Sequence, residues 1–335
     1  MKLVGVLLFL LANPLLANDA RLDLDLPTNE SESEKPIDKY EQAKEKLRQR
    51  WKEMEREEQR RKLASEEPSP KDTATKLEDA FMGAKQEEIE DLKAQLAEDD
   101  IRNNVLEVQV APGIMYVESD SPYYYRDYRT YSPSLALSAK IWLSPYMGFH
   151  ASYTTSTGAD VVDDLNGSNQ SIVSHEIFQY SLSRRKFLSA GSSFLEFSLD
   201  YKSYNFKVPS DSSYRANIKS NFYGFGFSYT DKIHHRLSKQ WLIKLYMFGS
   251  ESEDTVTTNF RSGELNKSYS VQIQRQWKYR INRKHSFFIN LQYIFDTHIY
   301  EGQATPADPK TGSNLEGVDV DTSFGLFQLG YEWGS

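Results

Sequence analysis

The chain of 335 residues contains no cysteine, so disulfide bonds cannot stabilise it and no cysteine is available for lipid attachment. Long apolar runs are also scarce: residues 3–17 form the only one, and the mean hydropathy is −0.63. The single apolar run and the low mean hydropathy exclude a protein that crosses a membrane with several apolar helices. They do not exclude a transmembrane barrel, because its strands alternate between lipid-facing and lumen-facing residues and average to a modest hydropathy.

An excess of positive charge is missing as well. Residues 18–100 carry 16 Lys and Arg against 25 Asp and Glu, and residues 101–335 carry 23 of each sign. Neither part has the basic surface that a nucleic-acid partner requires. Aromatic residues are scarce only in the first part: 4 of the 44 precede residue 101. The chain therefore consists of two physically different parts that meet near Asp100.

The first 17 residues have the pattern of an export signal. Lys2 supplies a positive charge, an apolar stretch follows, and Ala17 is a small residue at a suitable cleavage point, with Ala20 as the alternative. A single-span anchor is the other interpretation, but the run is shorter than the roughly 20 residues that a spanning helix needs. We expect residues 1–17 to be a signal peptide and the mature chain to be exported.

Residues 18–100 are predicted to form a charged arm, helical or disordered, on the periplasmic side of the membrane. The high charge and several prolines leave too little apolar surface for a globular core. Residues 37–64 favour a solvated helix, and a second helix follows the break at residues 65–70. The second helix has an apolar face made of Leu77, Phe81, Leu92 and Leu96. This face could pair with itself as a coiled coil, with a periplasmic protein partner, or with the mouth of the barrel.

Residues 101–335 change to a period of two. Leu195, Phe197 and Leu199, for example, alternate with Glu196 and Ser198. This pattern predicts an all-β fold, an antiparallel transmembrane β-barrel of about ten strands. The ten expected strands are 105–117, 133–143, 146–155, 171–182, 192–206, 216–230, 239–249, 267–280, 286–297 and 321–333.

Long and short connections alternate between these segments, apart from one tie in the middle. The short connections are predicted to be positively charged turns and the long ones negatively charged outer loops. An even strand number then leaves both termini, and the arm, in the periplasm. A soluble antiparallel barrel with its apolar face inward is the alternative. The apolar faces end in Tyr and Trp, which favours the aromatic girdle of a membrane barrel.

At this point the chain resembles the bacterial outer-membrane β-barrel superfamily over residues 101–335, including the terminal segment from Phe327 to Trp333. Gly334 and Ser335 follow Trp333, whereas such barrels usually end in an aromatic residue. The resemblance implies location in the cell outer membrane, surrounded by lipid and lipopolysaccharide. It does not single out one family.

Ten strands enclose little more room than the eight whose lumen side chains can fill, so a wide pore is not expected. Lys140, Glu196, Asp200 and Lys244 are predicted to face the lumen and to form a network of ion pairs. Further polar residues with this orientation are His150, Lys202, Gln272, Gln274, Gln276 and Lys278. A narrow or gated channel is the alternative interpretation.

Two short patterns resemble catalytic motifs of barrel enzymes. His150-Ala-Ser152 is similar to the His-x-Ser pair of outer-membrane phospholipases and lipid A deacylases, although the alternation turns both residues inward. Asp296-Thr-His298 resembles the Asp-His pair of omptin proteases, and Asp319-Val-Asp321 resembles their Asp-Asp pair. Here both pairs flank one loop, whereas omptins take them from opposite walls. His150, Ser152, Asp296 and His298 remain candidates, and no catalytic role is assigned.

The first outer loop is rich in tyrosine and arginine. Such a composition suits stacking on sugars or binding a protein partner, while girdle and loop packing is the alternative. The candidates are Tyr123, Tyr124, Tyr125, Arg126, Tyr128 and Arg129. Asp160, Asp163, Asp164 and Asn166 lack the spacing of a calcium loop, so neither a metal nor a cofactor is expected. The sequence therefore favours a non-enzymatic outer-membrane barrel with a structural or interaction role; a hydrolase and a narrow channel are its alternatives.

Overall fold

The computed structural model describes residues 48–56, 75–76, 78–80, 82–95, 104–156, 158–167, 169–188, 193–212, 214–234, 236–254 and 261–335. The predicted signal peptide and three residues of the predicted arm face, Leu77, Phe81 and Leu96, lie outside this set. The chain divides into two compact units, Met1–Pro68 and Ser69–Ser335. Residues 48–56 are helical in the first unit, and α3 (Gln86–Gln95) belongs to the second. Among the described residues, no helix has the length and apolar character needed to cross a membrane.

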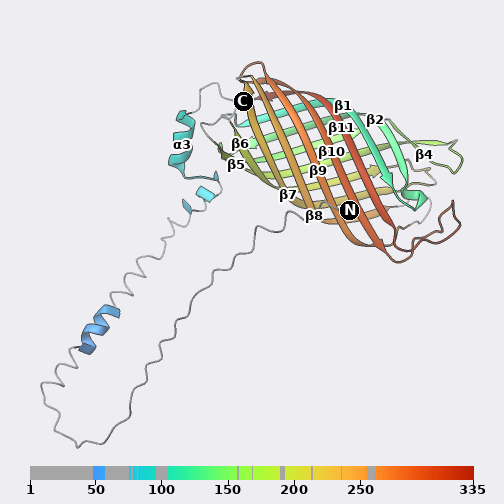
Figure 1. Cartoon of the computed structure of the whole chain (residues 1–335), viewed down its shortest axis with the longest axis horizontal. Helices are drawn as coiled ribbons and strands as arrows, with labels where there is room; N and C mark the ends of the chain where they lie inside the picture. The colour runs from blue at the N-terminus through green and yellow to red at the C-terminus, as the bar shows by residue number, and fades with distance from the viewer. Residues whose placement is uncertain are drawn as a thin grey trace, which may run out of the picture. The chain divides into compact units, whose positions relative to one another are not determined.

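The second unit contains a closed antiparallel β-barrel of ten strands (Figure 1). Each strand pairs with its neighbours in sequence, β1 pairs with β11, and β3 pairs with β5 to complete the wall. The strands are β1 (Leu106–Asp120), β2 (Tyr128–Trp142), β3 (Met147–Ser156), β5 (Gln170–Phe187), β6 (Phe194–Lys207), β7 (Asn217–His234), β8 (Leu237–Asp254), β9 (Glu264–Arg280), β10 (His285–Glu301) and β11 (Asp319–Gly334). The short strand β4 (Ala159–Val162) pairs with the start of β5 and extends the wall beyond β3.

The barrel follows from the period-two pattern. In β6, Phe197 and Leu199 are 50% and 57% exposed. Asp200, the residue that follows Leu199, is buried. The same alternation places apolar side chains on the outside of the other strands, and polar side chains face inward over much of the wall, as is typical of a transmembrane barrel. The prediction of an all-β transmembrane barrel of ten strands is thereby confirmed.

The strands are longer than predicted, because polar residues continue the ladders beyond the apolar stretches. β8 reaches Asp254 instead of residue 249, and β5 includes Arg184 and Arg185, which were expected in a turn. The longer connections, 121–127, 157–169, 208–216, 255–263 and 302–318, join strand ends at one end of the barrel, called the loop end here. The connections 143–146, 188–193, 235–236 and 281–284 define the turn end.

Apolar and aromatic side chains fill the lumen near the loop end. One buried cluster spans it from several walls and includes Met115, Tyr128, Ile177, Phe206 and Phe324. A second cluster packs the first loop against the last, with Tyr123 and Tyr125 beside Val318 and Ala304. The lumen is therefore blocked by packed side chains at this end.

Candidate functional site

Buried charges of opposite sign meet across the middle of the lumen. Lys244 Nζ lies 2.6 Å from Asp200 Oδ1, and Ser181 donates a hydrogen bond to the same carboxylate. Gly226 provides the room for this pair, because a Cβ there would lie 2.5 Å from Asp200 Oδ2. Strands β6 and β8 thus supply the two charges, and β7 between them supplies a residue without a side chain.

A second pair lies closer to the loop end. Lys202 Nζ is 2.5 Å from Asp296 Oδ1 and donates to Ser270 Oγ at 2.7 Å. Both charged side chains are 1% exposed. Removing a charge from water costs free energy, and here the attraction between the two opposite charges offsets that cost. The pair joins β6 to β10 across the lumen.

The turn end of the lumen holds two more ion pairs. Arg185 lies 3.4 Å from Glu196, with its guanidinium carbon 3.3 Å from the centre of the Trp142 ring. Lys278 bonds both oxygens of Glu332 at 2.8 and 2.7 Å. Of the four predicted lumen residues, Asp200, Lys244 and Glu196 lie in these networks, and Lys140 is aligned between Glu107 and His150 on the neighbouring strands.

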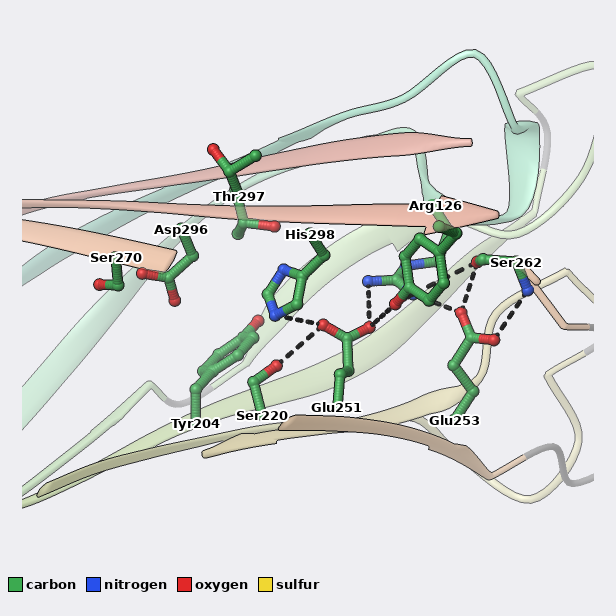
Figure 2. Close-up of polar contacts among 12 residues, drawn as sticks. Arg126, Tyr204, Ser220, Glu251, Glu253, Ser262, Ser270, Asp296, Thr297 and His298 are labelled. Atoms are coloured by element: carbon green, nitrogen blue, oxygen red, sulfur yellow. Dashed lines mark hydrogen bonds and ion pairs between the residues drawn. The ribbon is translucent and has the colours of Figure 1, made fainter. Parts of the chain in front are cut away.

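The largest cluster, called the Arg126 cluster here, lies at the loop end (Figure 2). Arg126 enters from the first loop and contacts the carboxylates of Glu251, at 2.7 Å, and Glu253. Glu251 also lies 2.5 Å from His298 Nε2. The remaining members accept or donate hydrogen bonds around this core and are Ser220, Ser262 and Tyr300.

Arg126 keeps its charge in this cluster although it is buried. Burial alone would lower the pKa of its guanidinium, but Glu251, Tyr300 and Glu253 overcome that effect and raise the pKa above the ordinary value for arginine. The first loop is therefore attached to the barrel wall by a permanent charge shared between two carboxylates of β8.

The structure separates the two pairs that resemble omptin residues. Asp296 and His298 point into the lumen, where they are 0% and 2% exposed, and Thr297 between them points to the other side (Figure 2). Asp321 accepts a hydrogen bond from Thr297 and so lies on that opposite face of the wall, together with Asp319, which is aligned with Ile299. The four acidic and histidine side chains therefore do not face one common site.

His150 and Ser152 also face inward, as the alternation predicted. No hydrogen bond between them is found among the described residues. His150 is aligned with Lys140 on one neighbouring strand and with Ser181 on the other. The pair therefore lies beside the lumen charges and away from the lipid-facing surface that a membrane-lipid hydrolase requires.

Five of the six loop candidates are buried, an arrangement that corresponds to the loop-packing alternative. Tyr123, Tyr124 and Tyr125 are 0%, 7% and 7% exposed, and Arg126 and Tyr128 are buried with them. The hydroxyl of Tyr124 donates to the carbonyl oxygen of Asp164 at 2.5 Å, and that of Tyr123 donates to the carbonyl oxygen of Pro306 at 3.0 Å. Arg129 alone is exposed, in an ion pair with Glu118.

The acidic residues of the second long connection serve to join loops. Asp163 accepts hydrogen bonds from Ser212 and from the backbone N–H of Tyr214, and Asp164 accepts one from the N–H of Asn169. Within the described part of the chain, no group of three or more potential ligands could hold a metal ion.

Sequence reasoning missed the two glutamates that organise the Arg126 cluster. Glu251 and Glu253 alternate with Ser250 and Ser252, so the period of two does continue past residue 249. Extending the strand along this polar alternation would have placed both carboxylates inside. Their partner could not be found this way, because Arg126 reaches them from a loop more than 120 positions earlier in the chain.

The segment before the barrel contacts the turn end. The carbonyl oxygen of Gly83 accepts a hydrogen bond from Arg184 at 3.0 Å, and that of Met82 accepts one from Ser144. Gly83 has a φ of +81°, and a Cβ there would lie 3.2 Å from Tyr146 Cβ. Of the predicted arm face, only Leu92 lies in the described residues, and it is half-buried.

Comparison with known proteins identifies the fold without naming a family. No protein-family model matches the chain, and no curated protein matches it. Among solved structures, the outer membrane protease OmpT from Escherichia coli aligns with a TM-score of 0.52 and 9% identity, over 72% of this chain and 100% of that one. The outer membrane protein OprG from Pseudomonas aeruginosa aligns with a TM-score of 0.32 and 11% identity, over 71% and 100%. The transport unit of the autotransporter AIDA-I from Escherichia coli aligns with a TM-score of 0.39 and 10% identity, over 73% and 97%. The similarity to OmpT is one of fold: both chains form closed antiparallel β-barrels.

Proposed function

We propose that this protein is a non-enzymatic barrel of the cell outer membrane with a structural or interaction role, and that its N-terminal arm and both termini lie in the periplasm. The proposal depends on one observation: the candidate catalytic side chains Asp296 and His298 are buried in ion pairs inside the barrel. Asp296 is bound to Lys202, and His298 is bound to Glu251, all without access to solvent. A hydrolytic site needs the same groups free to meet a substrate.

Charge at the two ends supports the orientation of the termini. Arg283 and Lys284 lie in a turn-end connection, and Arg236 lies in another. The contacts of residues 82–83 with Ser144 and Arg184 bring the end of the arm to the same side. A periplasmic partner would therefore meet the segment between Leu77 and Leu96 next to the barrel mouth.

Hydrolysis assays on the refolded full chain test the non-enzymatic role. Phospholipid, lipid A and peptide substrates should remain intact with the natural protein and with variants His150→Ala, Ser152→Ala and His298→Ala. An activity that the natural protein has and His298→Ala lacks would show an enzyme instead.

Planar bilayer recordings test the closed lumen. The natural protein should give no discrete current steps, because ion pairs and aromatic side chains fill the cross-section at several heights. Regular single-channel steps from the natural protein would support the narrow channel.

In-cell crosslinking tests the interaction role. A photoreactive residue placed at Leu92 should capture a periplasmic protein, whereas one at Phe225, which faces lipid, should not. Capture of the same proteins from both positions, or of none from any position between Leu77 and Leu96, would contradict a partner bound by the arm.

A further inference from the structure

The wall of the barrel is not hydrogen-bonded continuously between β8 and β9. Their register begins with Leu237 opposite Tyr279 and ends with Tyr246 opposite Ser270. β8 nevertheless continues to Asp254, and β9 begins at Glu264. In the described portions of these strands, residues 247–254 and 264–269 have no register partner across this seam.

Each strand keeps its other neighbour along this stretch. Residues 248–254 of β8 remain paired with β7, from Tyr223 opposite Phe248 to Asn217 opposite Asp254. Residues 264–269 of β9 remain paired with β10. The interruption therefore lies between β8 and β9, while the ladder of each strand with its other neighbour continues toward the loop end.

Both strands carry a β-bulge in the stretch that lacks register partners, β8 at its start and β9 within it. The register of β8 against β7 shifts at Met247, and that of β9 against β10 shifts at Asn266. A bulge bends its strand and changes the direction of its side chains. Met247 and Phe248, though consecutive, are 54% and 67% exposed, so both point to the lipid side.

Where the backbone ladder between β8 and β9 has ended, side-chain hydrogen bonds connect the two strands. Glu253 of β8 accepts hydrogen bonds from the backbone N–H of Ser262, at 2.8 Å, and from its hydroxyl, at 2.5 Å; Ser262 lies just before β9. Arg126 contacts Glu251, Glu253 and Ser262 and so holds β8 from the inside (Figure 2). The strands stay close, since a Cβ at Gly249 would collide with Ser268 Oγ.

We propose that the wall parts laterally between β8 and β9 in the loop-end half, and that the Arg126 cluster is the latch that holds it shut. Backbone N–H and C=O groups without hydrogen bonds cost free energy when they face lipid. They occur at membrane depth only where they are buried in protein or face a water-filled cavity. Parting of the seam gives them such surroundings, because the lumen side carries Ser268 Oγ and His298 Nδ1, two buried polar atoms that have no hydrogen-bond partner among the described residues. The open seam connects these groups with the outer part of the bilayer.

The absence of native cysteine allows a single-thiol test in the full chain, reconstituted in phosphatidylcholine vesicles. Ser268→Cys places a thiol behind the seam, and Ser134→Cys is its control. The two serines are 7% and 6% exposed, and within the part of the chain that the structure describes neither hydroxyl has a hydrogen-bond partner. Ser134, however, lies in β2 with paired residues on both sides.

N-Ethylmaleimide should react at position 268 at least about threefold faster than at position 134. Adding Glu253→Gln, which weakens the latch, should increase the rate at 268 and leave the rate at 134 unchanged. Glu118→Gln, which removes an exposed carboxylate elsewhere, should change neither rate. Equal rates at 268 and 134, in the presence and absence of Glu253→Gln, would overturn the proposal.

Hydrogen exchange of the natural chain gives a reading that needs no variant. About half of the backbone amides in 247–254 and 264–269 should exchange faster than those of 218–223 in β7, which are paired on both sides. Uniform protection across these segments would contradict a seam that parts. These outcomes do not depend on whether the protein hydrolyses a substrate or binds a partner through its arm.

Discussion

Single residues in the lumen carry much of the barrel's stability, because charges there have no access to water. Asp200→Ala leaves the Lys244 ammonium, 4% exposed, without its partner. Removing one member of such a buried pair costs about 3–5 kcal/mol. Urea unfolding in detergent micelles should therefore show a large loss of the free energy of unfolding.

The exposed pair Glu118–Arg129 is the control for Asp200→Ala. Its side chains are 29% and 73% exposed, so Glu118→Ala should cost less than about 1 kcal/mol. Replacing both buried partners, Asp200→Asn with Lys244→Gln, should recover part of the loss. Equal effects of Asp200→Ala and Glu118→Ala would show that the lumen is hydrated.

Asp308 should make the last long loop, residues 302–318, sensitive to acid. Its carboxylate accepts hydrogen bonds from the backbone N–H groups of Tyr124, Lys310 and Thr311. Burial would raise its pKa, but these hydrogen bonds outweigh burial and lower it below the ordinary value. A lowered pKa in the folded state means that the stabilisation is complete above the ordinary pKa of aspartate, about 3.9, and is lost as the pH falls through the lowered value.

The acid effect should be visible in amide exchange of residues 302–318, with Asp308→Asn compared with the natural protein at each pH. Near neutral pH the variant should exchange faster, and the difference should disappear at strongly acidic pH. A difference that is constant over the whole range would exclude titration of Asp308 as the cause.

At the scale of elements, the contact between the arm and the barrel depends on a glycine. Gly83 combines a φ of +81° with close approach to Tyr146, so Gly83→Val is strained in its backbone and crowded in its side chain. Residues 82–95 should lose protection against hydrogen exchange, while β2 and β3 keep theirs. Arg184→Ala, which removes the hydrogen bond to the Gly83 carbonyl, should act in the same direction.

Gly158→Ala is the control for the backbone strain in Gly83→Val. Gly158 also has a positive φ, +67°, but a Cβ there would meet no atom within 4 Å. This variant should leave the exchange of residues 82–95 unchanged. If Gly83→Val also leaves it unchanged, the contacts of Gly83 do not hold this segment.

The barrel strands themselves could be predicted because alternation is a local property. Leu195 to Leu199 show it in five residues, and the register with neighbouring strands follows from matching the apolar faces. The ends of strands could not be predicted as well, since Ser250 to Glu253 have no apolar residue to mark the outer face. The buried state of Tyr123 to Tyr125 was equally hidden, because it depends on Asp308 and other residues of the last loop.

At the scale of the whole molecule, a closed ladder predicts the resistance to detergent that is typical of membrane barrels. The unboiled protein should migrate differently from the boiled protein in a detergent gel and should fractionate with membranes. The cause is the pairing of neighbouring strands around the barrel. In the described residues this pairing is interrupted near the loop end between β8 and β9, and in β2, where residues 128–133 pair with β1 alone. A protein that stays in the soluble fraction and migrates identically with and without boiling would contradict the membrane barrel.

The sequence by itself determined that the chain has a charged N-terminal part and an alternating part, and that the alternating part forms a barrel with its apolar face outside. These properties depend on composition and on neighbours two positions apart. Only the tertiary structure decided which lumen charges meet, that the tyrosine-rich loop fills the mouth, and that Arg126 joins Glu251 and Glu253 where the β8–β9 ladder ends. Such contacts join residues far apart in the chain, 94 positions for Lys202 and Asp296 and 127 for Arg126 and Glu253. Closure of the barrel, which no local pattern records, is what brings them together.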